Sequence, residues 1–407
     1  MSVETTTPED VEGKLDLPPS YYRIFIAAIA ADGKLVYLDQ DSEDGPFTGT
    51  FTQLTDKSYD HAPLQAGLSM DGYVTILAQQ TGTQHLIYIR ESNDEANTNR
   101  FDQPVDLGLP PSVAAFQDTK LIRGLNGLDN IFGTAATTDN SIWWKFKNPY
   151  TIKTETEQVT PPGSDTPIEV TVQVPVPPAQ PWSDWIQIPG GLKSITAVNN
   201  ADGRLIIGGL NSGKIPYINF QNSDDPFTVE GWKGWEDISG VIGQFEQIEL
   251  AIDGNALVHI FGRIGTNIYM KAQKEVGKDD FTGWVLFAAF DEIIYTFDVD
   301  ACSNDGLYIT AQVGSGSGSP IYGWHQADPN LRTWTAPQII TFAQSDAQLV
   351  LEPNANTKLS LFALNTGSQM LDYTDQLLPD YWQAGWKRIG QGITSIAITH
   401  DITPNTK

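Results

Sequence analysis

Pairs of aromatic residues, three or four positions apart, are the side chains of this sequence best suited to bind a ligand. The clearest pairs are Trp182 with Trp185, Trp232 with Trp235, and Trp382 with Trp386. An exposed indole ring can stack on the apolar face of a sugar ring, and aromatic side chains often line ligand pockets. Binding is therefore the first chemistry that these residues suggest.

The two rings of a pair are expected to have different roles, because strand positions three apart face opposite ways. The second ring is Trp185, Trp235, Trp284, Trp334 and Trp386. We predict that it packs between repeats, since it does not vary. The first position is Trp182, Trp232, Phe281, Leu331 and Trp382. This variable position is the candidate for sugar contact, with packing as the competing interpretation.

Other chemistries have weaker support. The acidic segment Asp39–Gly45 has the alternating carboxylates of a calcium loop but no later glutamate, so a solvated turn is preferred. The five histidines, at 61, 85, 259, 325 and 400, lack metal-ligand spacing, and no phosphate loop or catalytic motif is present. No metal, cofactor or catalytic residue is predicted. A carboxylate pair for glycoside hydrolysis stays open, because it needs only spatial proximity.

The aromatic anchors recur roughly every fifty residues, which marks a repeat architecture. Weaker copies lie upstream, at Phe51 after Phe47 and at Val105 after Phe101. Between anchors, short alternating segments flank Gly or Asn turns, as at Ser212-Gly213. No amphipathic helix of three turns is found. The pattern predicts an all-β chain.

Each repeat holds four strands, which in the second repeat are residues 63–69, 73–79, 85–90 and 101–107. Four-stranded antiparallel units at this spacing are typical of propeller blades. One C-terminal strand, 394–400, and three N-terminal strands, 22–28, 34–39 and 47–54, would complete a blade that hides the sheet edges. We therefore predict a seven-bladed β-propeller closed by the terminal strands, spanning 20–407 as one domain after a flexible acidic tail at 1–19.

An insertion at about 151–181 interrupts the period. Residues 151–160 and 168–176 alternate in β-branched side chains around the turn cluster Pro161–Pro167, which predicts a projecting β-hairpin. A packing or protein-partner contact, a mobile proline-rich linker and a functional arm are the three interpretations, since a lone hairpin is marginally stable.

Charge and cysteine content exclude several classes of partner. Acidic residues outnumber basic ones 50 to 24, for a net charge of -26, so nucleic acid and anionic membranes are poor partners. Cys302 is the only cysteine, which excludes an intrachain disulfide. Without an apolar signal segment or an apolar run of spanning length, we expect no membrane insertion. The expected location is cytoplasmic, or exported without a cleaved signal peptide.

Two stretches resemble the repeat of the seven-bladed β-propeller lectins of the Photorhabdus type. These are Gly203–Tyr217 with Gly231–Ile238, and Ala256–Tyr269 with Phe281–Trp284. The resemblance implies non-catalytic binding of fucose and related sugars in pockets between blades. The family's Trp-Gln pair after the strand-end Tyr is approached only at Tyr322, Trp324 and Gln326. These three, then Trp182, Trp232 and Trp382, are the sugar-binding residues that the resemblance implies.

The predicted function is therefore that of a multivalent lectin, with glycans or glycoproteins as partners, fucosylated ones among them. The alternative is a structural or adaptor propeller that binds protein through one face or the inserted hairpin. An enzyme is the third interpretation. Exposed tryptophan rings in clefts between blades would favour sugars, whereas buried rings together with an apolar, exposed hairpin tip would favour the adaptor.

Overall fold

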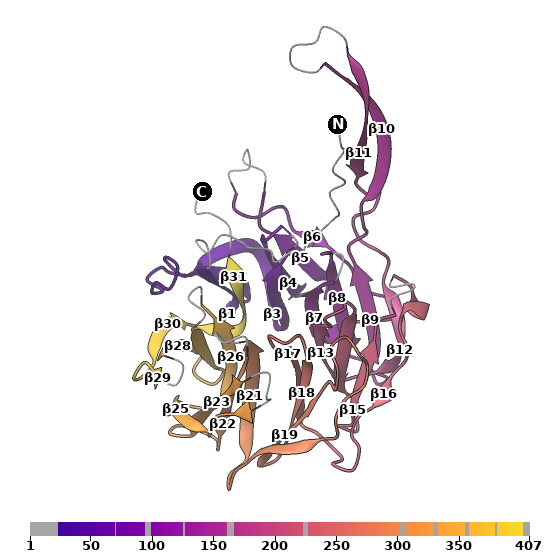
Figure 1. The fold of residues 1–407 in the computed structure, drawn as a ribbon. Helices are drawn as coiled ribbons and strands as arrows, with labels where there is room; N and C mark the ends of the chain where they lie inside the picture. Colours follow the sequence, from indigo (N-terminus) through magenta and orange to yellow (C-terminus); the bar gives the residue numbers. More distant parts are fainter. Residues whose placement is uncertain are drawn as a thin grey trace, which may run out of the picture.

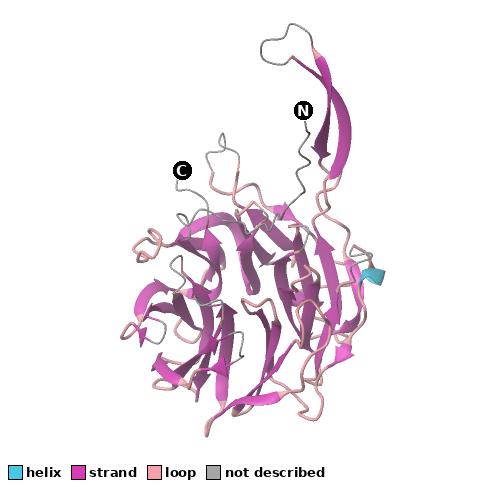
Figure 2. Ribbon diagram, viewed as in Figure 1, coloured by secondary structure: helices cyan, strands magenta, loops and turns pink. Residues whose placement is uncertain are grey.

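In the residues that the structure describes, the chain folds predominantly into antiparallel β-strands (Figures 1 and 2). A computed structural model describes residues 23–69, 71–93, 99–124, 127–160, 167–222, 227–301, 306–328, 333–354, 358–378 and 381–401. In this part of the chain the only helix is η1, a 3-10 turn at Val229–Gly231. None of its helices is long and apolar enough to span a membrane. The all-β prediction is confirmed, while the predicted tail at 1–19 lies outside the described residues.

The strands group into seven units, of which the first two share one long strand. Unit 1 is β31 (Ile393–Asp401), β1 (Arg23–Ala30), β2 (Lys34–Asp39) and the first part of β3 (Thr52–Leu68). Unit 2 is the rest of β3, β4 (Val74–Gln80), β5 (Leu86–Arg90) and β6 (Val105–Asp106). The strands predicted separately at 47–54 and 63–69 meet in β3, because no glycine or asparagine lies between Phe51 and Gly67 to turn the chain.

Units 3 to 7 follow in chain order. Unit 3 is β7 (Phe116–Arg123), β8 (Asp129–Ala135), β9 (Ser141–Phe146) and β12 (Ile186–Gly191). Unit 4 is β13 (Ser194–Asn199), β14 (Leu205–Leu210), β15 (Pro216–Phe220) and β16 (Glu236–Asp237). Unit 5 is β17 (Gln247–Ile252), β18 (Val258–Ile264), β19 (Asn267–Ala272) and β20 (Val285–Ala289). Unit 6 is β21 (Ile294–Ala301), β22 (Leu307–Val313), β23 (Pro320–Asp328) and β24 (Thr333–Trp334), with β25 (Gln338–Phe342). Unit 7 is β26 (Ala347–Pro353), β27 (Leu359–Asn365), β28 (Met370–Leu378) and β29 (Tyr381–Trp382), with β30 (Lys387–Gln391).

The two ends of the described chain meet in unit 1. Strand β31 pairs with β1 in antiparallel register, so that Thr399 lies opposite Phe25. The first strands of the seven units, β31, β3, β7, β13, β17, β21 and β26, together line one cavity of about 370 Å³. Each unit therefore presents its first strand to the same central space.

The core lies between neighbouring units. Strands β8, β14, β22 and β27 are buried at every position. Both faces of these strands are covered because a unit packs on each side, as Ile206 of β14 and Ile260 of β18 do within one apolar cluster. Junctions between units are consequently where side chains from two repeats can meet around a ligand.

Strands β10 (Thr151–Val159) and β11 (Ile168–Val176) occupy the position where the sequence predicts a hairpin. They pair along nine residues without a register shift, from Thr151 opposite Val176 to Val159 opposite Ile168. The hairpin projects away from the seven units (Figure 1). In the described residues neither strand pairs with any other strand.

Candidate functional site

The first rings of the aromatic pairs are buried between units. Trp182, Trp232 and Trp382 are only 8%, 8% and 9% exposed. Trp182 packs edge-on against Tyr88 of unit 2, with ring centroids 4.9 Å apart. Trp382 donates its indole N–H to the Tyr308 hydroxyl of unit 6, at 3.0 Å. These rings offer no open face to a sugar, contrary to the expectation for the first position.

Strand register explains this burial. The first ring pairs with a residue near the end of the third strand of its unit or just after it: Trp182 with Lys147, Trp232 with Gln221, and Trp382 with Gln376. Trp334 pairs with Gln326 in the same way. Trp334 is therefore a first-position ring, and its assignment from spacing as a second ring is corrected.

The remaining second rings also join neighbouring units, as predicted. Each donates its indole N–H to a main-chain carbonyl of the preceding unit: Trp185 to Leu107, Trp235 to Pro189, Trp284 to Ile238 and Trp386 to Phe342. In Trp334 the indole nitrogen is buried without a hydrogen-bond partner, which agrees with its different position.

Tyr322, Trp324 and Gln326 share one face of β23, and that face is turned towards unit 5. Trp324 is 3% exposed and Gln326 is fully buried, while Tyr322 packs on Phe290 with centroids 4.9 Å apart. Gln326 Oε1 accepts a hydrogen bond from the Leu307 main-chain N–H at 3.3 Å. The structure brings the three residues together, but in a filled junction.

The bond of Gln326 repeats around the molecule. In six units a side chain near the end of the third strand, or just after it, accepts a main-chain N–H near the start of the second strand; these are Gln40, Glu91, Gln221, Gln273, Gln326 and Gln376. The recurring Gln was a signal in the sequence that these residues are structural. In unit 3 the position is Lys147 instead, and Lys147 lines an open cleft.

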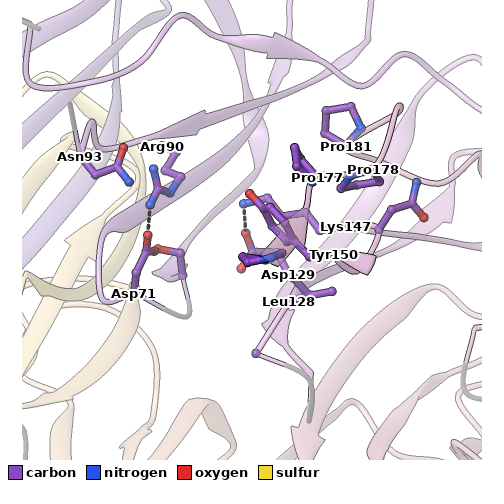
Figure 3. Close-up of a pocket in the computed structure, with 14 residues that line it drawn as sticks. Asp71, Arg90, Asn93, Leu128, Asp129, Lys147, Tyr150, Pro177, Pro178 and Pro181 are labelled. Carbon is purple, nitrogen blue, oxygen red and sulfur yellow. Dashed lines mark hydrogen bonds and ion pairs between the residues drawn. The ribbon is translucent and has the colours of Figure 1, made fainter. Parts of the chain in front are cut away.

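This cleft, of about 640 Å³, lies between units 2 and 3 (Figure 3). On the unit 2 side, Arg90 forms an ion pair with Asp71 and lies over the Tyr73 ring at 4.8 Å. Burial opposes ionisation of both groups, but their mutual hydrogen bond lowers the pKa of Asp71 and raises the pKa of Arg90. Both groups are therefore charged at neutral pH.

On the unit 3 side, Lys147 Nζ lies 2.8 Å from Asp129 Oδ2 and donates to the Tyr88 hydroxyl at 2.8 Å. Tyr88 in turn donates to Asp129 at 2.6 Å, and burial together with the Asp129 charge raises the pKa of Tyr88 well above its usual value. Tyr150, at the base of the hairpin, is 59% exposed and completes the lining with four prolines of the same segment. None of these cleft residues was predicted from the sequence.

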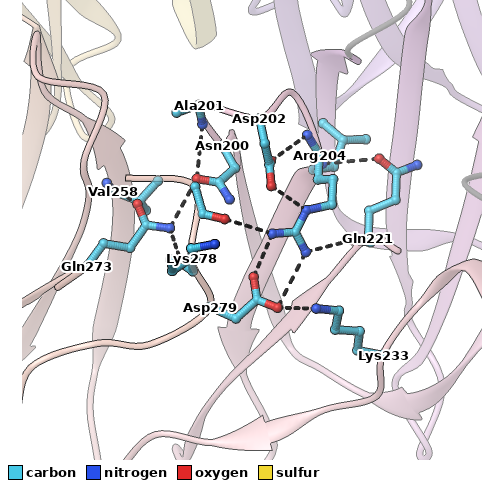
Figure 4. A network of polar contacts seen from close by, with 12 residues as sticks. Asn200, Ala201, Asp202, Arg204, Gln221, Lys233, Val258, Gln273, Lys278 and Asp279 are labelled. Carbon is cyan, nitrogen blue, oxygen red and sulfur yellow. Dashed lines mark hydrogen bonds and ion pairs between the residues drawn. The ribbon is translucent and has the colours of Figure 1, made fainter. Parts of the chain in front are cut away.

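The corresponding junction between units 4 and 5 is closed (Figure 4). Here the connection from β19 to β20 reaches back to unit 4, where Arg204 Nη2 donates to Asp279 Oδ1 at 2.8 Å and to the Gly277 carbonyl at 3.0 Å. Lys233 forms an ion pair with the same Asp279. In unit 3 the equivalent connection, from β9 to β12, is the one that holds the hairpin.

The central cavity is lined by a second cluster of ionisable side chains. Asp118, Glu249 and Asp298 line it, together with Lys120. Burial raises the pKa of Asp118 to about 6 and raises the pKa of Asp298 well above its usual range, helped in Asp298 by the charge of Glu249. Raised carboxyl pKa values suit proton donation at neutral pH.

Metal binding has no support among the described residues, where no group of three or more His, Cys, Asp or Glu side chains could hold an ion. Two acids of the Asp39–Gly45 segment have protein partners. Asp39 pairs with Arg100, and Asp41 accepts hydrogen bonds from Thr48. This agrees with the preferred interpretation of a turn.

No protein-family model and no curated protein sequence matches the chain. Among solved structures, AofleA from Arthrobotrys oligospora is similar at 8% identity and a TM-score of 0.44, over 86% of this chain and 91% of that chain. A mutant Aleuria aurantia lectin in complex with Fucalpha1-6GlcNAc is similar at 10% identity and a TM-score of 0.44, over 86% and 100%. The NanB sialidase of Streptococcus pneumoniae is similar at 11% identity and a TM-score of 0.47, over 78% and 68%.

Proposed function

We propose that the seven units are the blades of one closed β-propeller, and that this propeller binds carbohydrate without catalysis in the cleft between units 2 and 3. Ring closure is supported by the pairing of β31 with β1 and by the cavity that all seven first strands line. The observation that carries the binding proposal is the open cleft, whose 640 Å³ is in the usual range for small-ligand pockets.

The chemistry of the cleft suits a sugar. Neighbouring hydroxyls can donate to Asp71 while accepting from Arg90, and hydrogen bonds to charged groups are worth about 1.5–3 kcal/mol each. The exposed ring of Tyr150 can stack on the C–H face of a pyranose. The resemblance to Photorhabdus-type lectins makes fucosylated glycans the first class to test. Another hollow, between units 6 and 7, measures about 10 Å³, the space of a single water rather than a sugar.

A glycan array with purified full-length protein, read at two protein concentrations, tests the proposal. We expect a defined set of glycans to bind, and binding to be lost in Tyr150→Ala. Tyr381→Ala is the matched control, because Tyr381 is a comparably exposed tyrosine, at 66%, on unit 7. A blank array with the wild-type protein would overturn carbohydrate binding.

Hydrolysis is a second candidate, favoured by the carboxyls with raised pKa values in the central cavity. Glycoside hydrolysis needs one protonated and one ionised carboxyl on either side of the bond. Release of aryl leaving groups from a panel of aryl glycosides would show it, provided that Asp298→Asn abolishes the release. Failure of both assays would favour the adaptor role, for which the hairpin is the candidate contact.

A further inference from the structure

One face of the hairpin carries a row of aliphatic side chains beside a row of mainly charged ones. Directly opposed residues of an antiparallel pair share a face, so the register assigns every side chain. On one face β11 contributes an aliphatic row: Ile168, Val170, Val172, Val174 and Val176. The other face carries mainly Thr and Gln, including Thr171 and Gln173. The β10 residues beside the aliphatic row include Lys153, Glu155 and Glu157.

Among the described residues neither hairpin strand pairs with a third strand, and Val170, Val172, Val174 and Val176 of the row are only half-buried. Val159 and Ile168, at the far end of the hairpin, are 42% and 51% exposed. A single two-stranded ribbon is marginal in water, and a second layer on the face with the aliphatic row would supply the missing burial. A second layer on this face would therefore stabilise the hairpin.

We propose that this face binds the same face of a second copy of the chain, across a two-fold axis through Val172. The row is self-complementary about that point: Ile168 meets the partner's Val176, and Val170 meets the partner's Val174. The same axis places Lys153 against the partner's Glu157, twice by symmetry. Glu155 meets the partner's Glu155, an unfavourable contact that is moderated because each is 2.9 Å from Lys153 of its own strand.

The size of the face predicts how tightly the copies associate. Nine residues of strand at about 3.4 Å each make a face about 30 Å long and 10 Å wide, or about 300 Å² per copy. Stable complexes bury about 1,200–2,000 Å² in total, so this contact is weak and reversible. The net charge of -26 does not prevent it, because the arm holds the two bodies further apart than the Debye length of about 8 Å at physiological salt.

Sedimentation velocity of the full-length protein, from low to high micromolar concentration, tests this proposal independently of any sugar binding. We expect a monomer–dimer equilibrium, which Val172→Lys abolishes by placing a charge on the axis. Thr171→Lys introduces the same charge on the opposite face of the same strand and should leave dimerisation unchanged. A monomer at every concentration, or equal loss in both variants, would overturn the proposal.

Crosslinking tests the position of the axis. In a Cys302→Ser background, which removes the only native cysteine, Val172→Cys should join two chains through a short bismaleimide, whereas Thr171→Cys should not. Packed sheets lie about 10 Å apart, a gap that such a reagent spans and a direct disulfide does not. If a dimer forms but Val172→Cys is not crosslinked, the dimer uses another surface and the proposal is wrong.

Discussion

The junctions between units 2 and 3 and between units 4 and 5 both contain an aspartate–arginine ion pair but differ in what fills them. Each has an Asp-Gly turn, Asp71-Gly72 or Asp202-Gly203, whose glycine takes a positive φ of 81° or 79°. In each, the aspartate of that turn holds a nearby arginine. Arg204 directly follows its turn, whereas Arg90 is the last residue of β5. Between units 4 and 5 a loop delivers Asp279 to that arginine, whereas between units 2 and 3 the equivalent loop has become the hairpin.

This difference suggests that a binding site in a repeat protein can arise when a connecting loop no longer fills the junction between two units. The polar groups at the rim are present in both junctions, and their charge is satisfied locally in both. What distinguishes the open junction is the space above Arg90 and Asp71, which exists because the connection in unit 3 leads outwards. On this view, the junction between units 4 and 5 serves stability and the junction between units 2 and 3 serves binding.

The largest effect on stability is expected from replacing a buried tryptophan ring. Trp182→Ala should lower the free energy of unfolding by about 3–5 kcal/mol, because it leaves a cavity against Tyr88. Tyr150→Ala, an exposed ring on the same unit, should change it by less than about 0.5 kcal/mol. Urea denaturation of both variants measures the contrast, and equal losses would mean that Tyr150 is also a packing residue.

The closed junction should lose stability when its arginine is removed. Arg204→Ala leaves Asp279 with only Lys233, and we expect a loss of about 2 kcal/mol, between the values for exposed and buried pairs. The matched change at the open junction, Arg90→Ala, should cost less than about 1 kcal/mol, because its partner Asp71 is 45% exposed. Equal losses of unfolding free energy in the two variants would contradict this difference between the junctions.

The same two substitutions should affect glycan binding in the reverse order, with the larger loss in Arg90→Ala. Arg90→Ala should weaken binding of any glycan found on the array by about tenfold or more, since a hydrogen bond to a charged group is lost. Arg204→Ala should leave the dissociation constant unchanged. Isothermal titration of the folded variants measures this, and weaker binding in Arg204→Ala would place the ligand at the other junction.

A smaller effect is expected from pH. Asp118 has a pKa raised by burial to about 6, so the folded protein holds a proton there that the unfolded chain releases above about pH 4. The bonds of His400 to Glu352 and the Pro353 carbonyl outweigh burial and raise its pKa from 6.5 to about 9. Both groups contribute stability that is lost as pH rises, Asp118 between about 4 and 6 and His400 between about 6.5 and 9.

Urea denaturation between about pH 5 and pH 9 should therefore show a decline of stability with rising pH from these groups. Asp118→Asn should flatten the acidic part of that decline, and His400→Gln the alkaline part. If the wild-type profile is level and neither variant alters it, the two groups do not titrate as described.

Much of the fold could be predicted, because strand patterning and turns are local properties. Strand β2 lies at 34–39 as expected, and β31 at 393–401 extends the predicted 394–400 by one residue at each end. The roles of the rings were harder to predict, because spacing along the chain does not reveal register. The first-position rings Phe281 and Trp334 are 53 residues apart, against 50 between Trp182 and Trp232, so Trp334 fell where the spacing predicted a second ring. The residues of the open cleft showed no motif at all.

By itself the sequence determined the period, the all-β class and the meeting of the chain ends in one sheet, because these follow from local alternation and repetition. Only the tertiary structure decided which junctions are filled. Whether Arg204 meets Asp279, and whether a cleft lies beside Arg90, depends on the path of a connection from the next unit. Such contacts join residues tens of positions apart, where no local pattern of hydrophobicity or turn chemistry specifies which side chains meet.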